Sequence, residues 1–167
     1  MKSLSFVAAL LLAGGLASSC AGNIKAEDTR LAGAWHGHLK GTSGWLAAMK
    51  DLQFMYVFNK DGTLTESSNY DAYPPGPPAY GVWQKTGPRR FDAKYEVFLT
   101  KAVGITDEIA KGNGWSPNGY GILRETLTLS EDGNAFDSTL RFELYDAQGK
   151  PVDGGGTATN HAVRIRF

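Results

Sequence analysis

Apolar and polar residues alternate along most of the chain after residue 33, with the period of two that is typical of β-strands. In the clearest segment, Phe91, Tyr95 and Val97 fall on one face, and charged residues occupy the positions between them. The pattern recurs in eight segments: residues 34–40, 52–59, 63–70, 80–86, 90–100, 120–130, 135–145 and 157–167. Only residues 104–112 hint at a helical turn. The chain is therefore predicted to be all-β.

The connections between these segments alternate strictly between short and long. Residues 59–62, 85–88 and 130–133 are tight, glycine-containing turns, whereas residues 41–51, 71–79, 101–119 and 146–156 form long loops. Successive turns of an antiparallel meander lie at opposite ends, so the tight turns are expected at one end and the long loops at the other. Closing the meander removes its exposed edges and leaves room for one small ligand. We therefore predict an eight-stranded up-and-down antiparallel barrel.

Residues 1–19 have the parts of an export signal: a positive Lys2, an apolar run too short to span a membrane, and small residues at the end. The residues before Cys20 resemble the lipobox of bacterial lipoproteins, in which a cysteine is lipidated. The alternative is ordinary cleavage near Ala21. We predict a signal peptide at 1–19, a tether at 20–32 and one barrel domain at 33–167. The protein is then exported to the bacterial cell envelope, either lipid-anchored at the membrane or in the periplasm.

The charge balance and the single cysteine narrow the range of partners. The 167 residues include 17 Lys+Arg and 17 Asp+Glu, so a basic face for nucleic-acid phosphates is not expected. No segment after the leader is apolar for the roughly 18 residues that a membrane helix needs. Membrane contact is therefore expected through lipidation of Cys20. The composition does not set the oligomeric state.

Gly33 and Trp35 open the first predicted strand, and Arg164 and Arg166 lie on the last one. Together with the strand order and loop pattern of residues 33–167, this arrangement resembles the calycin superfamily, which includes lipocalins and fatty-acid-binding-like barrels. The resemblance implies that the Trp35 indole closes one end of the barrel and stacks against an arginine of the last strand. Both arginines share a strand face, so the sequence leaves either of them as the partner.

Three histidines raise the question of a metal site. His36 and His38 share a strand face, and His161 lies on the strand expected beside them, which is a zinc-like set. If Trp35 points inward, however, alternation turns His36 and His38 outward, and surface histidines are the preferred interpretation. His161 shares its face with Val163 and is expected inside the barrel. No nucleophile motif or phosphate-binding loop is present, so no metal, cofactor or catalytic residue is predicted.

Aromatic residues are abundant, with 4 Trp, 7 Tyr and 8 Phe. The residues expected to bind a ligand in the lumen are Tyr56, Phe58, Tyr95, Arg124, Phe142 and His161. Aromatic walls with a few hydroxyl groups suit an apolar ligand that carries one polar group. Arg124 shares its face with Thr126 and Thr128, which suits a polar-lined lumen holding a carboxylate. The alternatives are that the aromatic residues fill the barrel as core and that Arg124 is an exposed charge.

The long loops carry aromatic residues that are expected to form a lid or entrance: Trp45, Tyr73, Tyr80 and Trp115. Two alternatives are a small capping core and a docking face for another protein.

Three functions follow from this picture. The preferred one is a membrane-tethered barrel that sequesters or delivers a small hydrophobic molecule. The second is an enzyme of isomerase, cyclase or hydrolase type, which requires His161, Arg124 and Tyr95 to converge in the lumen. The third is an envelope interaction module with a filled barrel and an apolar loop patch.

Overall fold

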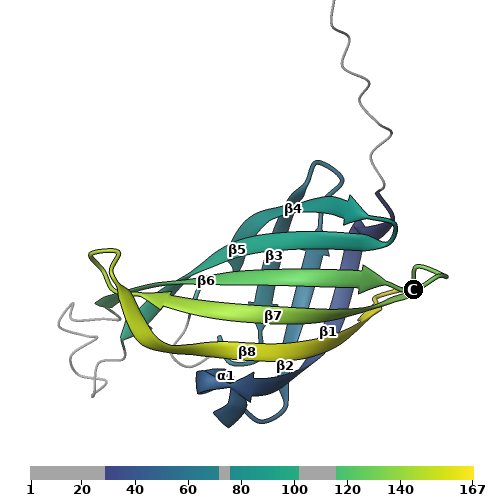
Figure 1. The fold of residues 1–167 in the computed structure, drawn as a ribbon. Helices are drawn as coiled ribbons and strands as arrows, with labels where there is room; N and C mark the ends of the chain where they lie inside the picture. Colours follow the sequence, from purple (N-terminus) through teal and green to yellow (C-terminus); the bar gives the residue numbers. More distant parts are fainter. Residues whose placement is uncertain (1–28, 72–75, 102–115) are drawn as a thin grey trace, which may run out of the picture.

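The computed structural model describes residues 29–71, 76–101 and 116–167. In it, eight antiparallel strands form a closed barrel in which neighbours in sequence pair with each other and β8 pairs with β1 (Figure 1). The elements are η1 (Thr29–Leu31), β1 (Gly33–Ser43), α1 (Gly44–Ala48), β2 (Leu52–Phe58), β3 (Thr63–Ser68), β4 (Ala79–Gly87), β5 (Arg90–Lys101), β6 (Ser116–Leu129), β7 (Ala135–Tyr145) and β8 (Pro151–Arg164). The predicted eight-stranded up-and-down barrel is confirmed.

The two ends of the barrel differ. The turns β2–β3, β4–β5 and β6–β7 lie at one end with the C-terminus, which we call the base, and α1 lies at the other, which we call the mouth (Figure 1). One expectation about the mouth is wrong. Residues 146–156 are not a long loop, because β8 already begins at Pro151 and the β7–β8 connection is a short turn closed by hydrogen bonds between Asp146 and Lys150.

The glycines of that segment belong to a bulge in β8 instead. Phe142 pairs with Gly156, and Leu144 pairs with Val152, so extra residues accumulate on β8. Gly156 has a φ of 137°, and a Cβ there would lie 2.0 Å from the carbonyl oxygen of Ser43. Only glycine permits this backbone approach, which brings the end of β1 against the bulge.

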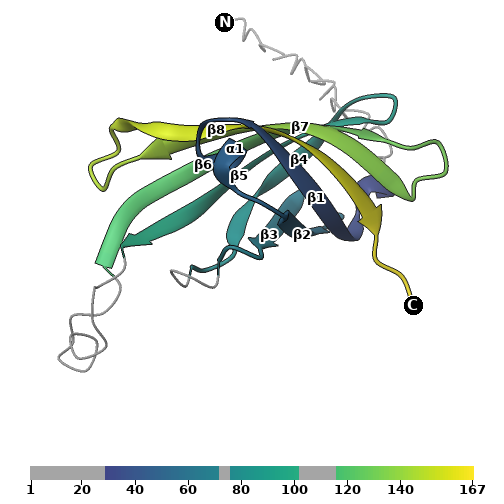
Figure 2. The ribbon, with the colours of Figure 1, turned by 90° about the horizontal axis from the view of Figure 1, so that it is seen from below.

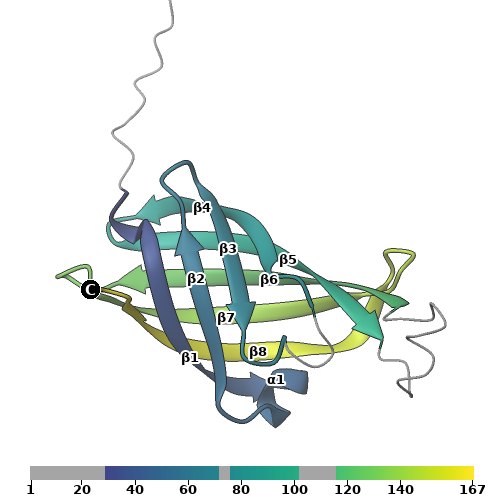
Figure 3. The ribbon, with the colours of Figure 1, turned by 180° about the vertical axis from the view of Figure 1, so that it is seen from behind.

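The strands have unequal lengths, and this shapes the mouth. β2 and β3 contain 7 and 6 residues, whereas β6 and β8 contain 14 each. Seen from behind and from below, β5–β8 extend past β2 and β3 (Figures 2 and 3). Since the tight turns align the strands at the base, the difference in length falls at the mouth. At the mouth, β2 and β3 therefore end before the strands that face them, and we call this shorter part of the barrel the low wall.

The base half of the interior is filled with aromatic side chains. Trp35 meets Phe136 edge to face, with ring centroids 5.0 Å apart, and Trp83 packs between Phe58 and Phe91 at 6.1 and 5.7 Å. Trp35, Phe58, Phe91 and Phe136 are each at most 1% exposed. Edge-to-face packing of this kind adds to the gain from burial. The base is therefore closed by a tightly packed core.

The arginine partner of Trp35 is Arg164, whose guanidinium carbon lies 4.1 Å from the centre of the indole ring. Gly33 makes room for it, because a Cβ there would lie 2.5 Å from Arg164 Nη1. Arg166 lies beyond the end of β8, is exposed, and donates a hydrogen bond to Asn134 Oδ1. The two arginines that the sequence left as alternatives thus have different environments.

The barrel domain begins before residue 33. Leu31 in η1 is fully buried, and its carbonyl oxygen accepts a hydrogen bond of 2.9 Å from Trp35 Nε1. Residues 29–32 are therefore part of the base and not of the predicted tether at 20–32, whose remaining residues lie outside the described part.

Candidate ligand-binding site

Next to the aromatic core of the base, on the side toward the mouth, the interior contains a cluster of hydrogen-bonding side chains. We call it the interior polar cluster, and its members are Tyr56, Glu66, Tyr95, Glu125, Ser138 and Asn160, each at most 7% exposed. Strand alternation explains how polar groups come to face inward. Glu125, for example, lies between Leu123 and Leu127 on the inner face of β6, and all three are buried.

Glu125 is the centre of this cluster. Its Oε2 accepts a hydrogen bond of 2.9 Å from the Tyr95 hydroxyl, and its Oε1 accepts bonds from Ser138 Oγ and, at 3.3 Å, from Asn160 Nδ2. Tyr56 completes the set, because its hydroxyl lies 3.4 Å from Glu125 Oε1 and accepts a bond of 3.1 Å from Asn160 Nδ2. These donors come from β2, β5, β7 and β8, so the carboxyl group of Glu125 ties the walls of the barrel together.

Glu66 is less well satisfied. It lies on β3 opposite Tyr56, is 5% exposed, and its Oε1 has no hydrogen-bond partner among the described residues. The same holds for Oδ1 of Asn160, which lies over Gly37, where a Cβ would be 2.4 Å away. Buried polar atoms are normally paired. These two oxygens are exceptions, and each is an acceptor without a partner among the described residues.

Burial and like charge shift the acid–base behaviour of the cluster. Burial raises the pKa of Glu66 well above its usual value, and the negative charges of Asp71 and Glu125 raise it further. Burial also raises the pKa of Glu125, against the opposing effect of its four hydrogen bonds, of which that from Ser138 is the largest. The pKa values of Tyr56 and Tyr95 rise through burial and the nearby Glu125, so both remain proton donors.

Above the cluster, toward the mouth, the inner wall is apolar and partly open. Val97 and Phe142 face inward and pack on the core but are only half-buried, as is Met49 after α1. Gly121 lies beneath them, since a Cβ there would be 2.2 Å from the Phe142 ring. The described residues thus leave an apolar wall near the mouth with acceptor oxygens below it.

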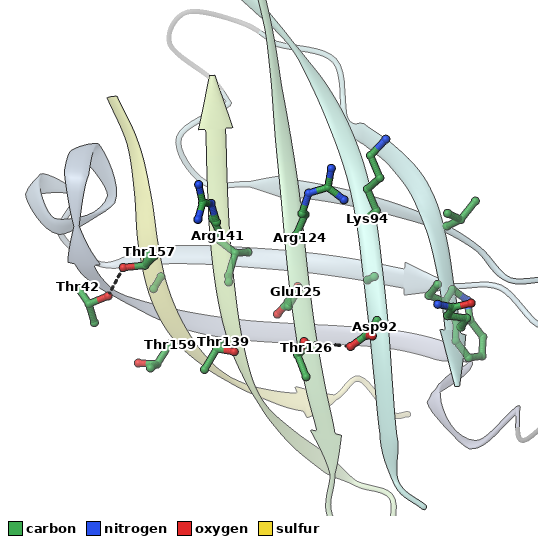
Figure 4. Close-up of a pocket in the computed structure, with 16 residues that line it drawn as sticks. Thr42, Asp92, Lys94, Arg124, Glu125, Thr126, Thr139, Arg141, Thr157 and Thr159 are labelled. Carbon is green, nitrogen blue, oxygen red and sulfur yellow. Dashed lines mark hydrogen bonds between the residues drawn. The ribbon is translucent and has the colours of Figure 1, made fainter. Parts of the chain in front are cut away.

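A hollow lies on the outside of the barrel. It is a depression of about 830 Å³ on the outer face of β4–β8, and Lys94, Arg124 and Arg141 form a row across it (Figure 4). These cations are paired: Lys94 with Glu96 at 2.9 Å, and Arg141 and Arg124 with Glu143 at 2.9 and 3.5 Å. All three are well exposed, and exposed ion pairs contribute little. The interior cluster, with its desolvated and unpaired acceptors, is therefore the better candidate site.

The structure brings only part of the expected ligand-binding set into the barrel. Tyr56, Phe58 and Tyr95 are buried inside, and Phe142 faces inward near the mouth. The expected lumenal positions of Arg124 and His161 are wrong. Because Glu125 points inward, Arg124 points outward with 53% of its side chain exposed.

His161 points outward for the same reason. Asn160 and Ala162 take the inner positions of β8, and His161 is 61% exposed and contacts Asp137 Oδ1 at 2.8 Å. Val163, which shares the strand face of His161, is also 47% exposed. An apolar residue on that face therefore did not indicate that the face points inward.

The residues expected at the entrance do not form one group. Trp45 is in α1, 53% exposed, and its indole lies close to Gly154. Tyr80 is 61% exposed on the outer face of β4. Tyr73 and Trp115 lie outside the described residues.

His36 and His38 lie on the outer face, as alternation predicted. His36 Nε2 is 2.8 Å from Gln53 Oε1, and His38 is opposite His161 in the β1–β8 pairing. Within the described ranges, no group of three or more His, Cys, Asp or Glu side chains is arranged to hold a metal ion.

Sequence reasoning missed four members of the interior polar cluster: Glu66, Glu125, Ser138 and Asn160. A usable signal was present, because each stands at a position where the alternation calls for an apolar residue. Ser138 lies between Phe136 and Leu140 on the same face of β7. A polar residue inside an apolar stripe is a better indicator of a lumenal site than a charged residue inside a polar one.

The fold and site together define a class: a closed eight-stranded antiparallel barrel with a packed base and a buried acidic cluster, which is compatible with a calycin-like fold. No family model matches the chain, and no curated protein is similar enough to it to count as a match. Among the described residues, no helix has the length and apolar character needed to cross a membrane.

Proposed function

We propose that this protein is a calycin-like carrier that binds a small, largely apolar molecule in the mouth half of its barrel. The observation that supports the proposal most is the contrast along the inner face. Side chains at the base are fully buried, and so are Leu46 and Leu52 on the β1–β2 side of the mouth. On the β5–β7 side, by contrast, Val97 and Phe142 are only half-buried, and the interior also holds unpaired acceptor oxygens. An apolar wall with a few convergent polar groups is the usual composition of a small-molecule site.

The low wall formed by β2 and β3 provides the way in. These strands end close to the level of Glu66 and Ser68, while the facing strands β5–β8 continue past them. A ligand would lie against the extended inner face of β5–β7 and direct its polar end down to the interior polar cluster. The filled base limits how far a ligand can enter the barrel, because Trp35, Phe58 and Phe136 occupy the space below the polar cluster.

A titration with a neutral fluorescent apolar probe, 1-N-phenylnaphthylamine, tests this site. We expect saturable binding to the purified full-length protein, with probe emission shifted to the blue. Val97→Trp adds bulk to the inner wall at the mouth and is expected to weaken binding at least tenfold. Val82→Trp adds the same bulk on the outer face, where Val82 is 58% exposed, and is expected to leave binding unchanged.

Organic extraction of the purified protein followed by mass spectrometry gives an independent readout. We expect a small molecule at a stoichiometric level that is absent from the Val97→Trp extract. The proposal is wrong if the probe fails to bind, or if both tryptophan variants weaken binding equally.

The residues that the enzyme alternative requires do not lie together in the barrel. It required His161, Arg124 and Tyr95 to converge, but only Tyr95 lies inside the barrel. A carrier therefore fits the described residues better than an isomerase, cyclase or hydrolase does.

We further propose that the chain is exported and anchored in the cell envelope through lipidation of Cys20. The support is the leader sequence and the position of the single cysteine, both of which precede the described residues. Cells expressing the full-length chain and labelled with radioactive palmitate should yield a labelled protein in the membrane fraction. Cys20→Ser should remove the label and release the protein from that fraction. An unlabelled wild-type protein would contradict the anchor and favour cleavage near Ala21.

A further inference from the structure

Among the described residues, the buried residues of charged type are Glu66 and Glu125, and both are acidic. Glu125 is close enough to contribute to the raised pKa of Glu66, and no ion pair to either carboxyl group is present in the described part. A buried carboxylate without a counter-charge is costly, and the raised pKa values of both carboxyl groups reflect this cost. A cationic ligand group beside Glu66 would supply the missing counter-charge, whereas an anionic group would not.

The inward-facing arginine at the base cannot serve as an anion receptor. Arg164 donates from Nε to the Gly133 carbonyl at 3.0 Å, from Nη1 to Ala32 at 2.8 Å and from Nη2 to Arg30 at 2.5 Å. Its guanidinium face is covered by Trp35. The aromatic core separates it from the mouth. A ligand carboxylate would therefore find no free cation in the described interior.

Acidic groups also lead from the mouth to the cluster. Asp71 follows β3 at the mouth, where its carboxylate accepts hydrogen bonds from the backbone N–H and hydroxyl of Ser68 at 2.6 and 2.7 Å. Its charge acts on Glu66, which in turn lies within electrostatic reach of Glu125. Acidic side chains thus extend inward from Asp71 through Glu66 to Glu125, along the route proposed for the ligand.

We propose that the ligand is an apolar amine, and that its protonated nitrogen donates a hydrogen bond to the unpaired Oε1 of Glu66. This inference rests on the proposed binding function and specifies the chemistry of the ligand's polar end. The ammonium group supplies the positive charge that the interior lacks, and the apolar part lies against Val97 and Phe142. Oδ1 of Asn160 offers a second free acceptor in the same cluster.

A matched series of displacing ligands tests the proposal. Decylamine, decanol and decanoate share one alkyl chain and differ only in the head group, and each is used to displace 1-N-phenylnaphthylamine from the full-length protein at pH 7.5. We expect decylamine to bind at least tenfold more tightly than decanol, and decanoate to bind least tightly. If all three bind within about threefold of one another, or decanoate binds best, the amine proposal fails while the carrier function stands. If neither the probe nor any of the three binds, the carrier function itself fails.

Variants locate the effect at Glu66. Glu66→Gln keeps the shape and removes the charge, and should abolish the preference for decylamine while leaving the affinity for decanol within about twofold. Glu96→Gln is the matched control, because Glu96 is exposed on the outer face, and it should keep the full preference. Equal loss in both variants, or none in Glu66→Gln, would overturn the assignment.

The wild-type protein gives a measurement that depends on no variant. The affinity for decylamine should fall as the pH is lowered and Glu66 becomes protonated, while the affinity for decanol stays constant. A decylamine affinity that stays constant over the whole pH range in which the protein remains folded would contradict a carboxylate–ammonium contact.

Discussion

The guanidinium group of Arg164 lies over the indole of Trp35, with its central carbon 4.1 Å from the centre of the ring, and joins the last strand to the first. Its three hydrogen bonds reach the carbonyl groups of Arg30, Ala32 and Gly133, which come from the N-terminal segment and the β6–β7 turn. Cation–π contact and carbonyl bonds act together here. The pair holds the base of the barrel closed where the chain ends meet.

Replacing Arg164 with alanine should therefore destabilise the protein by roughly 2–4 kcal/mol, since the stack and the three carbonyl bonds are lost together. Chemical denaturation monitored by tryptophan fluorescence measures this change. Arg166→Ala on the same chain segment is the control and should cost no more than about 0.5 kcal/mol, because Arg166 is exposed. Equal effects of the two substitutions would show that Arg164 has no special role.

The buried carboxyl of Glu66 should make stability depend on pH. Its pKa is raised in the folded state, so between its unfolded and folded pKa values the native protein binds more protons than the unfolded chain. Its contribution is therefore present at low pH and is lost as the pH rises through the folded pKa. Each pH unit of that interval changes the free energy of unfolding by about 1.4 kcal/mol.

Glu66→Gln should remove this dependence and make the protein more stable than the wild type above the folded pKa, with the difference shrinking toward pH 4. Thermal unfolding at a series of pH values measures it. Glu131→Gln changes a carboxylate that is 91% exposed and should follow the wild-type profile. A Glu66→Gln profile parallel to that of the wild type would show that Glu66 does not titrate as described.

The hydroxyl of Tyr95 should be important for stability because it donates directly to buried Glu125 at 2.9 Å. Tyr95→Phe leaves the carboxyl with one donor fewer and should cost roughly 1–3 kcal/mol. Tyr80→Phe removes a hydroxyl from a residue that is 61% exposed and should change stability by less than about 0.5 kcal/mol. Urea denaturation of the two variants under identical conditions compares them, and a neutral Tyr95→Phe would mean that Glu125 does not need this donor.

The β8 bulge should tolerate no side chain at Gly156. An added Cβ would lie 2.0 Å from the Ser43 carbonyl oxygen at a φ of 137°, so alanine there should cost more than about 3 kcal/mol or prevent folding. At Gly76 a Cβ meets nothing within 4 Å among the described residues, and Gly76→Ala should be nearly neutral. The soluble yield and melting temperature of the two variants give the comparison. Similar values for both would show that the bulge adapts to a side chain.

The interior site shows where sequence patterns mislead. Arg124 and Glu125 are adjacent, and the polar neighbours of Arg124 suggested a polar lumen. The structure reverses this assignment. Leu123 and Leu127 face inward, and Glu125 lies on the same face of the strand, so its carboxyl group also points into the barrel. Val163 likewise suggested an inward His161, yet Val163 is about half exposed, at 47%. Single apolar residues on a barrel surface are common, so they do not identify the inner face.

The sequence by itself determined the strands, their antiparallel order and the ends at which the connections lie, because a period of two and glycine-containing turns are local properties of the chain. The resemblance to calycin barrels placed Trp35 inside, and the alternation along the strand then placed His36 and His38 outside. Only the tertiary structure decided that Arg164 and not Arg166 stacks on Trp35, since that depends on where β8 ends against β1. The meeting of Glu66, Glu125 and Asn160 was likewise decided only by barrel closure, because residues far apart in sequence become neighbours through pairing register and closure across the lumen.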